Sequence, residues 1–345
     1  MAKILNTTPK AIRFYENKEL IFPEKDEANG YRIFTENDLL RLSTILSLRE
    51  VGFQVKDIKE LLEDPDMSIT QYLNVQRLAL FEKWIEMKDM LNTLDHMIKH
   101  TENGNDADPM IDIHRMAKHL KNLKEIRKNW RDKWDFDSWA DDFDQNIKKE
   151  GHTFNVHQDY DEALAKVAAT IQLKEGDTCL DIGIGTGNLG SRFLAKGISI
   201  IGVDQSEKML EACKRKHPAI DTRKGHFLAL PLLDNQTDGI VSSYALHHLP
   251  DSEKLLALEE MTRVLKPGGE ICIADLMFIN EDHRKSVMDG YRTANNTEAV
   301  FAIEDEYYAD RSVLAEWLST NGYQVQTFQI NDILSVIYAK RCETD

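Results

Sequence analysis

A glycine-rich run near the middle of the chain constrains the fold more than any other feature. Residues 181–187 follow the pattern Asp-x-Gly-x-Gly-x-Gly, between a short apolar-leaning lead-in and a segment, 188–196, that reads as a helix. Glycines at this spacing suit a turn from strand to helix, because residues without a Cβ let a ligand approach the backbone. The N–H groups at the start of such a helix can bind a polar or charged ligand end. The run therefore predicts a ligand site in an α/β domain.

A second predicted strand, 198–203, ends in an acid, Asp204, which lies 19 residues after Gly185. An acid at this strand tip suits a pair of ribose hydroxyls, whose hydrogen bonds it can accept. A Gly-x-Gly-x-x-Gly pattern would indicate a nicotinamide or flavin dinucleotide. Here the third glycine comes one residue early and position 188 is Asn, while Asp181 stands two residues before the first glycine.

This pattern resembles the nucleotide-binding loop of class I S-adenosylmethionine-dependent methyltransferases. The resemblance implies that Asp181 and the glycine loop face the methionine part of S-adenosyl-L-methionine and that Asp204 holds the ribose. The alternative is a glycine-rich turn in some other α/β domain. The further cofactor-binding residues that the resemblance implies are Gly183, Gly185, Thr186, Gly187, Gln205, Met209, His226, Phe227, Ser243 and Tyr244.

Later segments match the same family in order, so that the resemblance covers about residues 130–341. Residues 225–231 match a loop whose acid accepts the adenine amino group, but His226 and Phe227 stand at its second and third positions. Backbone N–H groups and stacking on Phe227 can still hold the adenine. A turn at 265–269, a strand at 270–274, a helix at 307–321 and a hairpin of 323–330 with 334–341 follow. The implied fold is a Rossmann-like α/β domain with a seven-stranded, mostly parallel sheet.

An aromatic-rich segment precedes this core, with five aromatics in the 14 residues from Trp130 to Phe143. It resembles the segment that forms a lid over cofactor and substrate in many of these methyltransferases. The implied lid residues are Trp139, Phe143, which replaces the usual Tyr, and Tyr160. The alternative is that an amphipathic helix packs these rings on the sheet.

Methyl transfer is an in-line displacement at a sulfonium, in which the protein aligns the reactants and excludes water. A base is needed only if the nucleophile arrives protonated. His247 and His248 follow the fourth predicted strand, at the edge where ligands bind in doubly wound sheets. His247 is the better catalytic candidate; the alternative is that the pair caps or packs against a helix. His152 and His157 remain undetermined, and the sequence predicts neither a hydrolytic arrangement nor a metal site.

The first third of the chain reads as a separate helical region. Residues 11–16, 29–34, 48–53 and 58–62 resemble, in order, the DNA-binding head of the MerR family of transcription factors. The resemblance covers about residues 2–64 and implies an all-helical winged-helix head at 1–68. One helix of this head would enter the major groove of double-stranded DNA while basic residues hold the backbone. The DNA-binding residues that it implies are Lys10, Arg13 and Arg32.

Two departures from the family lead us to expect weak DNA binding. The chain begins almost at the turn, so most of the family's first helix is missing, and residues 1–60 carry ten Lys or Arg and ten Asp or Glu. Phosphate neutralisation normally supplies much of the affinity for DNA. The alternative is a head that only dimerises.

Residues 69–100 follow the head and predict a long helix through which two copies of the chain form a homodimer. The apolar positions of this helix alternate spacings of four and three, which is typical of a coiled-coil seam. Leu73 extends the seam toward the N-terminus, but Arg77 interrupts it. The alternative is packing on the chain's own domain. The seam comprises Leu80, Trp84, Met87, Leu91, Leu94 and Ile98. A polar linker, 101–108, then precedes Pro109 and a helix at 110–130, which gives domain boundaries of 1–68, 69–100, 101–129 and 130–345.

Length and composition bound the function. A chain of 345 residues suggests two domains, and no apolar run approaches the ~20 residues of a membrane span. Four scattered cysteines and the lack of an apolar signal segment predict a cytoplasmic protein. The net charge of −16 disfavours non-specific nucleic-acid binding by the whole molecule. Two hypotheses remain: an enzyme that methylates a small molecule, or a transcription regulator whose methyltransferase fold only senses S-adenosyl-L-methionine or another ligand.

Overall fold

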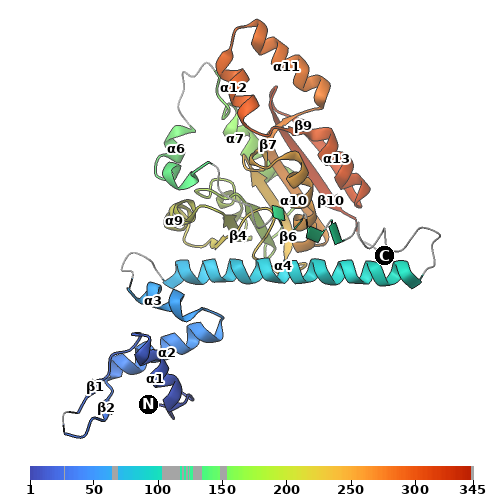
Figure 1. Cartoon of the computed structure of the whole chain (residues 1–345). Helices are drawn as coiled ribbons and strands as arrows, with labels where there is room; N and C mark the ends of the chain where they lie inside the picture. Colours follow the sequence, from blue (N-terminus) through green and yellow to red (C-terminus); the bar gives the residue numbers. More distant parts are fainter. Residues whose placement is uncertain are drawn as a thin grey trace. The chain divides into compact units, whose positions relative to one another are not determined.

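The computed structural model describes residues 1–26, 28–63, 69–102, 134–147 and 154–342, together with 117, 118, 120, 121, 123, 125 and 126. The chain divides into two compact units, Met1–Ala79 and Leu80–Asp345 (Figure 1). Most of the predicted linker at 101–108 lies outside the described residues, as do Trp130 and His152. No helix in the described ranges is both long and apolar enough to cross a membrane.

The first unit is built from three helices around a small apolar core. Helix α1 (Pro9–Asn17) begins with a proline, and its first amides are capped by Thr8, whose hydroxyl accepts a hydrogen bond from Ala11 N. Helices α2 (Glu36–Glu50) and α3 (Val55–Glu63) follow. Strands β1 (Glu24–Lys25) and β2 (Arg32–Ile33) pair as an antiparallel hairpin, so the prediction of an all-helical head misses a short strand pair. The shared core comprises Ile12, Tyr15, Leu20, Ile21, Leu42, Ile45, Leu48, Phe53, Ile58 and Leu61.

The second unit contains a twisted sheet in the order β5-β4-β3-β6-β7-β10-β9, with the two-residue β8 beside the end of β7. All strands on this path are parallel except β10, which runs antiparallel to both of its neighbours. The predicted Rossmann-like, mostly parallel fold is therefore confirmed. The strands are β3 (Thr178–Ile182), β4 (Ser199–Asp204), β5 (Asp221–Lys224), β6 (Thr237–Ser243), β7 (Leu265–Phe278), β8 (Ala309–Asp310), β9 (Tyr323–Gln329) and β10 (Leu334–Arg341).

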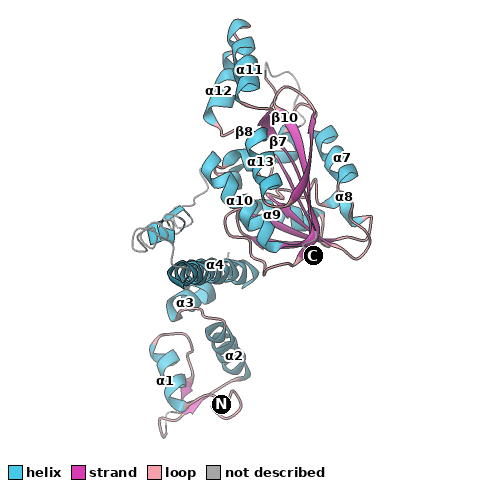
Figure 2. Cartoon of the chain, turned by 90° about the vertical axis from the view of Figure 1, so that its right-hand side faces the viewer, coloured by secondary structure: helices cyan, strands magenta, loops and turns pink. Residues whose placement is uncertain are grey.

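Helices cover both faces of this sheet, because its central strands are apolar on both sides. Successive residues of β7 enter two different cores: Ile271 and Ile273 pack in one, and Cys272 and Ala274 in the other. Figure 2 shows α7 and α8 on one side of the sheet and α10 and α13 on the other. The helices are α7 (Tyr160–Thr170), α8 (Ser191–Leu194), α9 (Glu207–Lys216), α10 (Asp251–Val264), α11 (Glu281–Thr293), α12 (Thr297–Asp305) and α13 (Arg311–Thr320).

Five elements of the second unit differ from the sequence-based expectation. Helix α8 is four residues long, because turns occupy the chain from Gly187 to Gly190, so the glycine loop does not open directly into a long helix. Strand β7 runs through the predicted turn at 265–269, with an irregularity where it passes β6. Helix α13 is shorter than predicted, and α11 and α12 were not predicted.

Helix α4 (Ile69–Glu102) contains the predicted seam, but its residues do not all lie on one free face. Within the second unit, the Trp84 ring lies 4.9 Å from the Arg263 guanidinium, and Ile85 is buried. Lys88 Nζ forms an ion pair with Asp234 at 2.5 Å. Trp84 therefore packs on the chain's own domain, as the alternative interpretation expected. The other predicted seam residues, Leu80, Met87, Leu91, Leu94 and Ile98, are exposed in the single chain.

Candidate functional site

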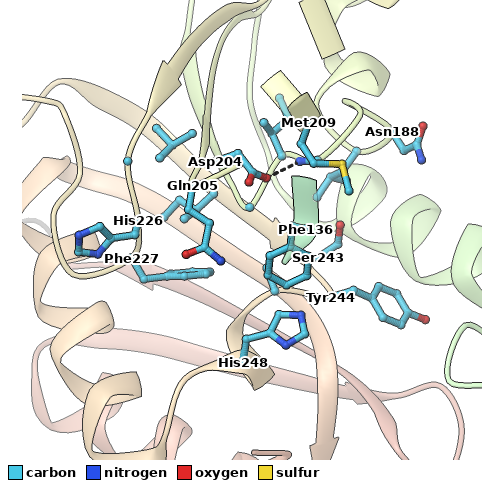
Figure 3. Close-up of a pocket in the computed structure, with 18 of the residues that line it drawn as sticks. Phe136, Asn188, Asp204, Gln205, Met209, His226, Phe227, Ser243, Tyr244 and His248 are labelled. Carbon is cyan, nitrogen blue, oxygen red and sulfur yellow. Dashed lines mark hydrogen bonds between the residues drawn. The ribbon is translucent and has the colours of Figure 1, made fainter. Parts of the chain in front are cut away.

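A pocket of about 820 Å³, its open mouth included, lies at the carboxyl ends of β3, β4 and β6 (Figure 3). This is the point where the strand order reverses, with β4 on one side of β3 and β6 on the other. Ligands bind at such switch points in open α/β sheets because the loops leave the sheet in opposite directions there. The predicted residues that line the pocket are Gly183, Gly185, Asp204, Gln205, Met209, His226, Phe227, Ser243, Tyr244, Phe143 and Tyr160.

Five predicted residues lie outside this lining. Asp181 is buried, Gly187 approaches Cys213 and His217, and Thr186 donates to Asp144 at 2.7 Å. Trp139 is half exposed and His247 is buried. The lining residues that sequence reasoning did not assign to the site include Phe136, Asn188 and His248. Phe136 lies in the aromatic-rich segment and His248 is the second member of the His-His pair, so the sequence pointed to both neighbourhoods but not to these two residues.

Asp204 ties the glycine loop to the tip of β4. Its Oδ2 accepts a hydrogen bond from Gly185 N at 2.8 Å, and its Oδ1 accepts one from Ser206 N at 2.9 Å (Figure 3, in which the Asp204 carboxylate makes the dashed hydrogen bond). Each carboxylate oxygen has a second lone pair. The carboxylate therefore shapes the loop and can still accept hydrogen bonds from a ligand's hydroxyls.

Two glycines of the loop have different surroundings, and only one of them faces open space. Gly183 has φ +70°, and a Cβ there would lie 2.4 Å from the Cβ of Ala245. Gly185 has φ +53°, and a Cβ there would meet nothing within 4 Å. Gly183 thus permits a close approach of two loops, whereas Gly185 faces open space beside Asp204.

Asp181 is fully buried behind the loop, and its oxygens have no hydrogen-bond partner of good geometry among the described residues. Burial raises the pKa of Asp181 to about 8; the nearby Gly190 amide opposes this rise and the Asp204 charge adds to it. The side chain is thus protonated at neutral pH in the ligand-free protein. A buried carboxyl without partners beside a binding loop is a group whose environment a ligand can complete.

The segment that contains Phe136 and Phe143 is fastened over the pocket by two aspartates. In η1 (Phe136–Trp139), Asp137 accepts a hydrogen bond from Ser206 Oγ at 2.6 Å. In α6 (Phe143–Asn146), Asp144 accepts from Thr186 Oγ1 at 2.7 Å, Asn188 Nδ2 at 2.9 Å and Lys216 Nζ at 2.6 Å. Burial works against ionisation of Asp144, but these donors outweigh it and lower the pKa of the carboxyl. Asp137 and Asp144 thus hold both aromatic rings in place.

Aromatic rings form the wall opposite Asp204. The Tyr244 ring lies 5.1 Å from Tyr160 and 5.4 Å from His157, and Phe136 lies 4.9 Å from the His248 ring. Tyr244 has φ +49°, a left-handed conformation that residues with side chains rarely adopt. Its hydroxyl is buried and has no partner among the described residues. This wall is aromatic, and one of its residues, Tyr244, has a strained backbone.

His247 lies behind the pocket, close to two acids, Asp275 and Glu306. Its Nδ1 lies 2.5 Å from Asp275 Oδ1, and its Nε2 lies 3.5 Å from Glu306 Oε2. Burial opposes a charge on His247, but the Asp275 and Glu306 carboxylates outweigh it and raise the pKa of the imidazole. Burial and the neighbouring His247 hold the pKa of His248 well below its ordinary value.

The predicted DNA-binding residues lie in the first unit. Lys10 and Arg13 are exposed on α1. Arg32 is partly buried, and its Nε donates to Glu16 Oε2 at 2.6 Å. One of the three predicted DNA-binding residues is thus already paired with an acid within the head.

Comparisons with known proteins agree with this division of the chain. Residues 179–269 match a family model described as a methyltransferase domain, and residues 1–64 match one described as a MerR HTH family regulatory protein. An uncharacterized methyltransferase of Oceanobacillus iheyensis is 32% identical over 207 residues, which are 60% of this chain and 95% of that protein. One of Bacillus pumilus is 32% identical over 211 residues, which are 60% and 96% of the two chains.

Two solved structures are similar to this chain at low identity. A protein described as an S-adenosyl-L-methionine-dependent methyltransferase of Methanococcus maripaludis is 21% identical, with a TM-score of 0.44, over 63% of this chain and 98% of that chain. A Haloferax volcanii complex of a methyltransferase with its activator Trm112 gives 22% identity and a TM-score of 0.47, over 62% and 100%.

The close approach at Gly183 can be tested by substitution. Gly183→Ala places a methyl group against Ala245, whereas Gly176→Ala adds the same methyl at φ +89° with nothing within 4 Å. Both variants carry the left-handed backbone cost of roughly 1–2 kcal/mol. We expect Gly183→Ala to melt clearly below Gly176→Ala in thermal unfolding. Equal melting temperatures would show that the two loops can separate without cost.

Burial of Asp181 makes stability depend on pH. Because folding raises the pKa of Asp181 from 3.8 to about 8, the folded protein retains a proton that the unfolded chain releases. The destabilisation of the folded protein by the buried Asp181 carboxyl is therefore absent below about pH 4 and grows as the pH rises toward 8. We expect Asp181→Asn, which stays neutral, to stabilise the ligand-free protein by roughly 3 kcal/mol more at pH 8 than at pH 5. The exposed Asp161→Asn is the control, and a gain that does not change with pH would contradict the burial argument.

Proposed function

We propose that this chain, which belongs to the methyltransferase family and has a MerR-family helix-turn-helix head, transfers a methyl group from S-adenosyl-L-methionine to a small molecule. The observation that supports this most is the arrangement of Asp204: one carboxylate shapes the glycine loop and faces a pocket closed by aromatic rings. S-adenosyl-L-methionine, when bound, supplies the sulfonium methyl group. The protein then has to bind, align and exclude water.

The residues of the pocket fit this cofactor in three parts. Asp204 lies at the tip of β4, where a carboxylate can accept hydrogen bonds from the two ribose hydroxyls. Phe227 and Met209 are buried beside Gln205 and offer apolar surfaces for the adenine. Gly183, Gly185 and Ser243 line the part of the pocket beneath the lid, where the methionine part would lie.

The remaining space favours a small methyl acceptor. Phe136, Phe143 and Tyr244 line it, and Asp137 and Asp144 fasten the segment above it. Aromatic rings beneath a fastened segment suit a small acceptor and favour the exclusion of water around it. His248 faces this space, whereas His247 does not. We therefore assign His247 a positioning role: its ring lies 4.0 Å from His248 and supports it against the pocket.

Replacing Asp204 tests cofactor binding. A carboxylate that accepts hydrogen bonds is worth roughly 1.5–3 kcal/mol, so Asp204→Ala should weaken S-adenosyl-L-methionine about 10- to 150-fold in calorimetry. Asp221→Ala, at the start of the adjacent strand β5, removes an exposed acid and should bind like wild type. Equal affinities for both variants would remove Asp204 from the site.

The exposed face of α4 supports the proposed homodimer. Met87 and Leu91 are more than half exposed in the single chain, on a helix whose other side packs on Arg263 and Asp234. Such a row of large apolar side chains on a long helix favours pairing with a second helix.

Charge substitutions on this face test the dimer. Met87→Glu with Leu91→Glu would bury like charges without partners, so light scattering should report a monomer. Lys83→Glu with Asn92→Glu, at exposed polar positions of the same helix, should remain dimeric. A dimer that survives the first pair would place the interface elsewhere.

The alternative function, a regulator that senses the ligand, is favoured by one contact. His226, which lines the pocket, has its Nε2 3.7 Å from Glu82 Oε1 on α4, and α4 is continuous from residue 69 to 102. Arg263 lies over Trp84 and also donates to Leu230 O at 3.1 Å, in the same loop. A ligand beside His226 would thus lie one side chain away from α4.

A DNA pull-down separates the two functions. We expect weak binding, because Arg32 is paired with Glu16 and the head has no net positive charge. The full chain would be incubated with fragmented genomic DNA at low salt, with and without S-adenosyl-L-methionine. Enrichment of one near-palindromic site, lost in Arg13→Ala and changed by the ligand, would make the regulator the primary function. No enrichment leaves the head as a dimerisation platform for the enzyme.

A further inference from the structure

We propose that His247, His248 and Glu306 form a binding site for a divalent transition-metal ion at the edge of the pocket. One ligand atom from each of these residues lies within 4.8 Å of the other two. The histidines belong to η2 (Leu246–His248), directly after β6, and Glu306 caps the end of α12. Because Glu306 is 58 residues from His248, the sequence shows no metal-ligand spacing, and the group is assembled only by the fold.

The second shell of this group has the arrangement that metal-binding histidines require. A histidine that binds a metal through one ring nitrogen usually donates its other N–H to a carboxylate. His247 Nδ1 lies 2.5 Å from Asp275 Oδ1, which leaves Nε2 directed at Glu306, 3.5 Å away. Asp275 is itself fixed, because its oxygens accept hydrogen bonds from three backbone amides, those of Ala245, Leu246 and Leu276.

His248 supplies the second, independent observation. Its Nδ1 is buried and has no hydrogen-bond partner in the described part of the chain. Buried polar atoms in native proteins are normally satisfied by protein, water or an ion. The His248 ring lies 4.0 Å from that of His247 and faces the pocket beneath Phe136 (Figure 3). A cation between the two rings and Glu306 would satisfy this nitrogen.

The local charges favour a cation at this position. Asp275 and Glu306 bring two carboxylates to the group. The nearby ammonium of Lys254 is bound by the carbonyls of Leu249 and Tyr307 and by Asp251. Without a metal, the same arrangement could only serve as an ion pair of a charged His247 with its two acids, and His248 Nδ1 would remain unsatisfied.

Two imidazoles and one carboxylate suit Zn²⁺, Fe²⁺ or Co²⁺ and leave coordination positions open. Ligands of a tetrahedral zinc lie about 3.4 Å apart, so binding requires only small rotations of these side chains. Glu306 is partly exposed and provides a route from solvent. Because His248 also lines the pocket, an ion bound here would lie beside the space proposed for the methyl acceptor. This consequence rests on the proposed function, whereas the metal site does not.

The experiment measures metal binding directly, without cofactor or acceptor. The full chain is stripped with a chelator, titrated with Zn²⁺ in a calorimeter and with Co²⁺ by visible absorption, and analysed for bound metal after dialysis. The chain has 11 histidines, so adventitious binding must be separated from this site. Glu306→Gln and His248→Ala remove ligands of the cluster. Glu304→Gln, two residues from Glu306 on the exposed side of α12, and His217→Ala, on α9's end, are the matched controls.

We expect wild type and both controls to retain one additional, tightly bound ion per chain compared with either cluster variant. They should also show cobalt absorption bands that the cluster variants lack. Asp275→Asn should retain the ligands but bind 10- to 100-fold more weakly. Circular dichroism identifies any variant that fails to fold, and the conservative Glu306→Gln then decides. Equal stoichiometry and affinity in wild type and Glu306→Gln would overturn the proposal. Loss of S-adenosyl-L-methionine binding elsewhere in the pocket would not affect this result.

Discussion

The site depends on one carboxylate at the tip of β4. Asp204 accepts hydrogen bonds from the amide of Gly185 in the preceding loop and from the amide of Ser206 in the following one. These bonds give the glycine loop its course, and the open space at Gly185 is next to the same carboxylate. Because the loop's own short helix α8 begins only at Ser191, the loop is held from the end of β4, by the Asp204 carboxylate and by the Val203 carbonyl, which accepts hydrogen bonds from the amides of Gly183 and Ile184.

Two further aspartates connect the loop to the segment above it. Asp137 is bound by Ser206, two residues beyond Asp204, and Asp144 is bound by Thr186 and Asn188 of the glycine loop. The aromatic rings of the lid thus rest on the same short stretch of backbone that shapes the ligand site. Opening this lid requires three or more hydrogen bonds to break together. A ligand that rearranges the loop would therefore alter the lid as well.

The sequence predicted a mostly parallel sheet, its C-terminal hairpin and many of the residues that line the pocket, because a glycine loop, a strand-tip acid and alternating hairpin residues are local patterns. Asp181 was placed in the site but is buried behind it, since a single spacing cannot distinguish a side chain that faces a ligand from one on the opposite face of a strand. His248 was missed by one position and Phe136 by three, for a similar reason: short 3₁₀ turns change direction at each residue. The cluster with Glu306, and the packing of Trp84 on Arg263, depend on contacts distant in sequence.

The central claim is that the pocket beside Asp204 holds S-adenosyl-L-methionine beneath the aromatic lid. The most direct measurement is a crystal structure of the full chain grown with S-adenosylhomocysteine. We predict that the ribose hydroxyls bond to Asp204, that the adenine lies against Phe227, and that the sulfur points toward the space bounded by Phe136, Tyr244 and His248. A pocket that stays free of this molecule at saturating concentration, or a molecule bound away from Asp204, would contradict the account.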